Sequence, residues 1–299
     1  MIEKPVPRRT YAELGQFVLA SFAHMGIGVP AGSRLWRMCN LFVNKDGSER
    51  RKIKASDPDC EVAIEAGRDL VQFAFIFDAL PAPVLAQFKI ELTKAIGDQA
   101  LPQHSLENSF GRDSQFHLYV ASITHNAGFA KVRNAEPDVV GELADEECGF
   151  AAKRIKSVSN LRARIKKASV QIAKTKRPGL IVLETSLAFN RTNSRITQPL
   201  PEAEFARLYY SYFQRFISHN QKRFESFVDP WWVCGIVFHD QQIRLVGTEW
   251  QIGGMTFGVP LAARCISDPG RFWRQYEQGL PNRMTSPIAT VSPRLWLPA

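Results

Sequence analysis

The chain has 299 residues and a formal net charge of +9, and 45% of its residues are hydrophobic, as is typical of a globular protein with a core. No run of 18 apolar residues occurs and no apolar segment follows the charged N-terminus, so we expect neither a transmembrane helix nor a signal peptide. The five cysteines are scattered and lack C-x-x-C spacing, which favours reduced thiols in a cytoplasmic protein over a zinc site.

Residues 1–110 are predicted to form a helical domain. Within it, apolar residues recur at helical spacing, so aromatic residues at these positions are expected to build the core. The stretch Pro81-Ala82-Pro83 should end the third of these helices. The predicted helices cover 11–24, 35–43, 60–80 and 84–96.

The segment 113–186 is predicted to alternate between helix and strand. Phe116, Val120 and Ile123 recur at helical spacing and predict a first helix, which Gly128 should end. Short β-compatible runs then predict three strands, and a second amphipathic helix and a buried strand follow. In chain order the helix, three strands, helix and strand cover 113–127, 130–135, 139–143, 149–155, 159–176 and 180–183.

The remaining chain is predicted to mix helix and strand. A helix is expected over 202–217, and the apolar run that starts at Val233 predicts a β-hairpin whose turn lies at Gln241-Gln242. A last short helix is expected over 267–278. The sequence therefore predicts a mixed α/β protein with three parts: a helical domain over 1–110, a core over 111–190 and an α+β extension over 191–299.

Two charged side chains in the predicted core suggest a site. Asp138, preceded by Pro137, opens the second strand and Lys153 lies late on the third, so a hairpin would bring both side chains to one sheet edge. This Pro-Asp, with Ala151-Ala152-Lys153 in that order of elements, resembles the PD-(D/E)XK nuclease superfamily. The resemblance covers 113–186 and implies an αβββαβ restriction-endonuclease-like core.

The resemblance implies a metal site, but one residue of this sequence departs from the family pattern. Family members hold Mg²⁺ or Mn²⁺ with two carboxylates, and place the lysine beside the attacking water. Here Ala151 stands where the family has an acid two residues before the lysine. We expect Asp138 to be one metal ligand and Glu136 the other, because the two share the same face of a continuous strand.

Two further residues are candidates for the same site. His117 stands on the first core helix, where superfamily members often carry a glutamate, and an imidazole can bind a metal or act as a base. Gln171 resembles the glutamine that several branches of the superfamily carry on the second core helix, although a surface role is an equal alternative.

Positive charge is concentrated around these residues. Between Cys148 and Leu183 there are ten lysines and arginines and no aspartate or glutamate, a field that attracts a polyanion. The alternative is an ordinary solvated face, but such faces usually mix charges of both signs. The residues expected to contact phosphates are Arg154, Lys156, Arg164, Lys167 and Lys174.

Three hypotheses for the function follow. The first is a Mg²⁺- or Mn²⁺-dependent endonuclease that cleaves DNA. The second, which follows from Ala151, is an inactive nuclease fold that binds nucleic acid. The third is a structural subunit of a larger complex, such as a phage-defence system. The sequence leaves open the choice between DNA and RNA, and between a homo-oligomer and a multi-protein complex.

Overall fold

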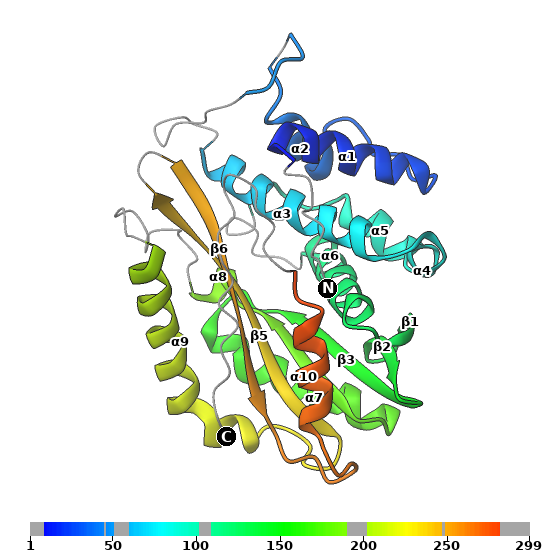
Figure 1. Ribbon diagram of the computed structural model, residues 1–299, viewed down its shortest axis with the longest axis vertical. Coiled ribbons are helices and arrows are strands. Elements are labelled where there is room, and N and C mark those ends of the chain that lie inside the picture. The colour runs from blue at the N-terminus through cyan, green and yellow to red at the C-terminus, as the bar shows by residue number, and fades with distance from the viewer. Residues whose placement is uncertain are drawn as a thin grey trace, which may run out of the picture.

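A computed structural model describes residues 9–44, 46–50, 60–101, 109–189, 202–246 and 249–281 (Figure 1). The fold is mixed α/β, as predicted, and its centre is a six-stranded mixed sheet. None of the helices in these ranges combines the length and the apolar composition that spanning a membrane requires.

The strands follow each other across the sheet in chain order. β1, β2 and β3 form an antiparallel meander, β3, β4 and β5 are mutually parallel, and β6 returns antiparallel to β5. The parallel neighbours need crossover connections, which α7 and α9 provide. The strands are β1 (Ala130–Ala135), β2 (Asp138–Leu143), β3 (Glu146–Arg154), β4 (Gly179–Glu184), β5 (Val233–Val246) and β6 (Glu249–Pro260).

Helices cover both faces of the sheet (Figure 1). The N-terminal helices are α1 (Tyr11–His24), α2 (Arg34–Asn40), α3 (Cys60–Ala79), α4 (Ala82–Gln87) and α5 (Lys89–Ala95). The later ones are α6 (Phe110–Asn126), α7 (Leu161–Thr175), α8 (Ser186–Phe189), α9 (Glu202–Glu225) and α10 (Gly270–Gln278).

Alternation along the strands builds two hydrophobic cores. Ala152 and Val182 face α6, α10 and the N-terminal helices, whereas their neighbours Ala151 and Ile181 face α7 and α9. Adjacent residues of a strand point to opposite faces, so each strand contributes to both cores. The first core is one cluster in space, and its buried residues come from segments between Tyr11 and Leu280.

The predicted order of elements over 113–186 is confirmed. α6, β1, β2, β3, α7 and β4 occur in that order, and β2 and β3 are adjacent and antiparallel with Gly141 opposite Cys148. The strands β5 and β6 continue the same sheet. The division of the chain into three domains stays a prediction.

Two local predictions were wrong. The expected turn at Gln241-Gln242 lies inside β5, where Gln241 pairs with Gly254 of β6, so strand pairing continues through two polar residues. The single helix expected over 84–96 is two helices, α4 and α5, which meet at Phe88. The backbone of Phe88 leaves the helical region (φ −104°, ψ 20°) and its side chain is fully buried.

Candidate functional site

The predicted meeting of Asp138 and Lys153 is confirmed. Because β2 and β3 are antiparallel, the first residue of β2 lies beside the last residues of β3. Lys153 Nζ donates to Asp138 Oδ2 at 2.5 Å, and the backbone N–H of Ala152 donates to the same oxygen at 2.9 Å. The Lys153 and Asp138 side chains are 10% and 13% exposed, so the ion pair is largely shielded from water.

His117 approaches the other oxygen of the same carboxylate. Its Nε2 lies 3.8 Å from Asp138 Oδ1, and its side chain is 25% exposed. The helix α6 packs on β2 and β3, which places His117 at the sheet edge where Asp138 stands. The structure therefore brings together three of the residues that the sequence singled out: Asp138, Lys153 and His117.

Gln171 on α7 holds the chain that leads into β2. Its Nε2 donates to Glu136 Oε1 at 3.4 Å and to the Pro137 carbonyl oxygen at 3.3 Å. Its Oε1 is buried and has no hydrogen-bond partner among the described residues. The prediction that Glu136 and Asp138 share a continuous strand was wrong, because Glu136 lies in the turn between β1 and β2. Glu136 is exposed and accepts from Gln171 of α7, whereas the Asp138 carboxylate accepts from Lys153.

Asp113 is a further acidic residue of this region that the sequence analysis did not single out. It stands one helical turn before His117 on α6 and is half-buried. Burial raises the pKa of Asp113, and the positive charges of Arg154, His117, Arg164 and Lys156 act against that rise. The i, i+4 spacing of Asp113 and His117 on the first core helix was the signal that could have identified it.

The basic residues divide between the interior and the surface. Lys167 and Lys174 are exposed on α7, and Arg164 is half-buried beside Asp113. Lys156 is also half-buried, and burial lowers its pKa. These four expected phosphate contacts lie on α7 or just before it.

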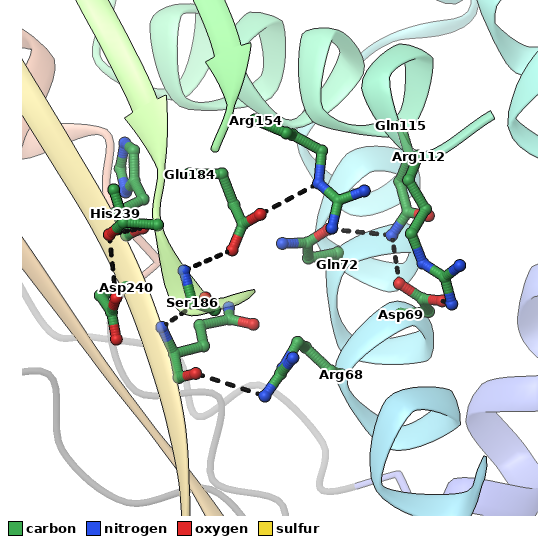
Figure 2. Close-up of polar contacts among 12 residues, drawn as sticks. Arg68, Asp69, Gln72, Arg112, Gln115, Arg154, Glu184, Ser186, His239 and Asp240 are labelled. Carbon is green, nitrogen blue, oxygen red and sulfur yellow. Dashed lines mark hydrogen bonds and ion pairs between the residues drawn. The ribbon is translucent and has the colours of Figure 1, made fainter. Parts of the chain in front are cut away.

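Arg154 points into the protein. Its Nε donates to Glu184 Oε2 at 3.0 Å, and the two side chains are 13% and 9% exposed (Figure 2). Strand alternation is the reason, because Arg154 must face away from the side that Lys153 faces. We therefore leave Arg154 out of the surface that is expected to contact phosphates.

A buried polar cluster lies next to this ion pair, between the N-terminal helices and the sheet (Figure 2). Asp69 of α3 accepts hydrogen bonds from Arg34 at 2.5 Å, from Gln115 at 3.1 Å and from Arg112 at 3.4 Å. Burial acts to raise the pKa of Asp69, but the charges of Arg34 and Arg112 outweigh burial and hold the pKa below its usual value.

Across the described ranges, no three His, Cys, Asp or Glu side chains are grouped so as to hold a metal ion by themselves.

No family model matches the chain, and neither the curated proteins nor the solved structures contain a significant match.

Proposed function

We propose that this protein is a divalent-metal-dependent nuclease with a restriction-endonuclease-like core. The observation that supports the proposal is the Lys153–Asp138 pair at the edge of a sheet with the order α6-β1-β2-β3-α7-β4. That pair and that order are what the PD-(D/E)XK resemblance implies. The charge of α7 supports a polyanionic substrate, and DNA is the substrate that we propose.

The residues present fit Mg²⁺ or Mn²⁺ in chemical kind. Mg²⁺ prefers oxygen ligands and usually keeps several waters, so one or two carboxylates and a substrate phosphate can hold it. Asp138 would be one ligand through Oδ1, because Oδ2 is engaged by Lys153. Glu136 or Asp113 would supply the second carboxylate, and His117 is the alternative donor. When bound, the ion would polarise the phosphate and lower the pKa of a bound water.

The protein residues then have separate tasks. Lys153 orients the attacking water and stabilises the negative charge that develops on the phosphate. Gln171 positions the Asp138 end of β2 through its hydrogen bond to Pro137. Lys167 and Lys174 bind flanking phosphates, since each is exposed on the side of α7 that carries Gln171.

Cleavage of supercoiled plasmid by the purified protein tests the proposal. With Mg²⁺ or Mn²⁺ we expect nicked or linear product, and with EDTA none. Lys153→Ala and Asp138→Asn should each lower the rate at least about a hundredfold, the scale of lost transition-state stabilisation. Lys131→Ala is the matched control, because Lys131 also pairs with a carboxylate but is 70% exposed on β1, away from the site. Equal cleavage by all four proteins would refute the proposal.

One observation favours a second candidate, an inactive nuclease fold that binds nucleic acid. Ala151, at the place of the family acid, is fully buried under α7 and supplies no ligand. If the natural protein binds DNA without cleaving it and Ala151→Glu creates metal-dependent cleavage, this candidate is correct. If the natural protein cleaves, Ala151→Glu should raise its activity, and Glu136→Gln should matter less in that background because the two carboxylates would be redundant.

A further inference from the structure

A cavity of about 540 Å³ lies on the other side of α7, between the start of that helix and the end of α9. A connection of a few residues separates its first lining residue, Val158, from Lys153 on β3. The cavity is lined by Val158, Leu161, Arg162, Phe216, Asn220, Arg223, Phe224 and Phe227.

The lining combines an aromatic floor with a cationic rim. Phe224 is buried, Phe216 and Phe227 are half-buried, and all three line the cavity. Arg162 and Arg223 are exposed, and the Arg162 guanidinium carbon lies 4.7 Å from the centroid of the Phe227 ring. Within the part of the chain that the structure describes, neither arginine forms an ion pair, and the cavity has no acidic lining residue.

This combination suits a ligand that is planar at one end and anionic at the other. Guanidinium groups bind phosphate oxygens through two parallel hydrogen bonds, and aromatic side chains stack on bases irrespective of base identity. The volume lies within the range of about 300–1,000 Å³ that is typical of small-molecule sites. Val158 is 45% exposed at the mouth, which leaves apolar surface for a sugar or a ring edge.

We propose that this cavity binds a nucleotide, with the base against Phe216 and Phe227 and the phosphate between Arg162 and Arg223. The nucleotide is either free or the unpaired end of a nucleic-acid strand, since both present a base and a phosphate in the same way. The assignment goes beyond cleavage at Asp138 and Lys153 and does not depend on it.

Calorimetric titration of the full chain with EDTA present tests the assignment. AMP and dAMP are the free ligands, a short single-stranded oligonucleotide is the strand, and adenosine and ribose 5-phosphate each lack one half of the recognised group. We expect a nucleotide to bind more tightly than either half. A free mononucleotide that binds as well as the oligonucleotide identifies the free ligand, and binding of the oligonucleotide alone identifies the strand.

The variant Arg162→Gln/Arg223→Gln should weaken this binding about tenfold or more, because hydrogen bonds between charged groups are lost. The matched control, Lys166→Gln/Arg215→Gln, removes one exposed charge from each of the same two helices outside the cavity and should change affinity less than about threefold. A second variant, Val158→Glu, sets a negative charge at the mouth and should weaken binding similarly.

Equal losses in the arginine variant and its control would overturn the assignment, as would binding of ribose 5-phosphate as tight as that of AMP. Lys153→Ala should leave nucleotide binding unchanged. Loss of cleavage in Lys153→Ala together with normal nucleotide affinity therefore keeps the two proposals separate. A protein that binds nucleotides but never cleaves DNA refutes the nuclease alone.

Discussion

At the scale of single residues, two aspartates, one half-buried and one buried, differ in their partners. Asp138 gives one oxygen to Lys153 and the N–H of Ala152, and its other oxygen lies 3.8 Å from His117. Asp69 is instead surrounded by Arg34, Arg112 and Gln115. In our proposal the first carboxylate offers its second oxygen to a ligand, whereas the second carboxylate holds α3, α2 and α6 together.

Removing the charge of Asp69 should therefore destabilise the fold. Asp69→Asn leaves two buried arginines without their counter-charge, a loss of about 3–5 kcal/mol in the free energy of unfolding. Urea unfolding measures it, and Asp46→Asn in an exposed turn is the control, with little expected change. Similar stability of both variants would mean that the arginines are compensated in another way.

His239 should make stability depend on pH. It is buried, with Nε2 3.0 Å from the Tyr276 hydroxyl oxygen and Nδ1 3.0 Å from Thr256 Oγ1, and burial lowers its pKa from 6.5 to about 3. At pH values between these two pKa values, His239 binds a proton in the unfolded chain but not in the folded chain. The contribution of His239 to stability is thus complete above pH 6.5 and is lost as the pH falls towards 3, by about 1.4 kcal/mol per pH unit.

Urea midpoints measured from pH 7 to pH 4 test this contribution. His239→Gln removes the titration while keeping a polar side chain, and carboxylates titrate alike in both proteins. The stability difference between natural protein and variant should therefore shrink as the pH falls. Parallel curves would show that the pKa of His239 is the same in the folded and the unfolded chain.

At the scale of elements, α7 has two different sides. Leu161, Ile165 and Ile172 are buried against the sheet. One side carries Gln171 and leads to the candidate active site, and the other carries Arg162 and borders the cavity beside α9. A single helix thus connects the two proposed sites.

The exposed charges on the Gln171 side should bind DNA. Lys167→Gln/Lys174→Gln should weaken duplex binding and lower the slope of log K against log salt by about two, one per lost phosphate contact. Lys166→Gln, on the opposite side of the same helix, is the control and should leave the slope nearly unchanged. The measurement is the duplex affinity of each variant at several salt concentrations, which gives the slope directly. An equal change in slope per removed charge on both sides of α7 would indicate that the charges attract DNA only diffusely.

At the scale of the whole molecule, α10, the last helix that the structure describes, is tied to α6, the first core helix. Asn126 of α6 donates to the carbonyl oxygen of Gly279 at 3.0 Å, and Gln275 donates to the carbonyl oxygen of Ala127. A Cβ at Gly279 would overlap the backbone at Ile123 and Ala127. The contact joins the end of the described chain to the core that begins at Tyr11.

Gly279→Ala should consequently lower the free energy of unfolding by about 1–3 kcal/mol, the cost of forcing an extra methyl group into a packed contact. Gly28→Ala is the matched control, because nothing lies within 4 Å of a Cβ there and its φ is not positive. Thermal unfolding of both variants measures the effect. Equal melting temperatures would mean that α10 can shift away from α6 without cost.

Much of the arrangement followed from local sequence patterns. Helical and strand periodicity over 113–186 predicted the order of elements, because these patterns depend on which face of each segment is apolar. The same order placed Asp138 beside Lys153, since an antiparallel pair joined by a short turn brings the start of one strand to the end of the next. Composition alone predicted only a globular chain with a core, and the mixed α/β class followed from the predicted helices and strands.

Only the tertiary structure decided the rest. Strand alternation turns Arg154 away from the side that Lys153 faces, but its ion-pair partner Glu184 lies on the neighbouring strand β4, 30 residues away in sequence. Asp113 became part of the candidate site through the packing of α6 on the sheet, and the cavity exists because α9 lies beside α7. Each depends on contacts between segments far apart in the chain, and the short-range periodicity of a sequence does not encode which distant side chain will complete a site.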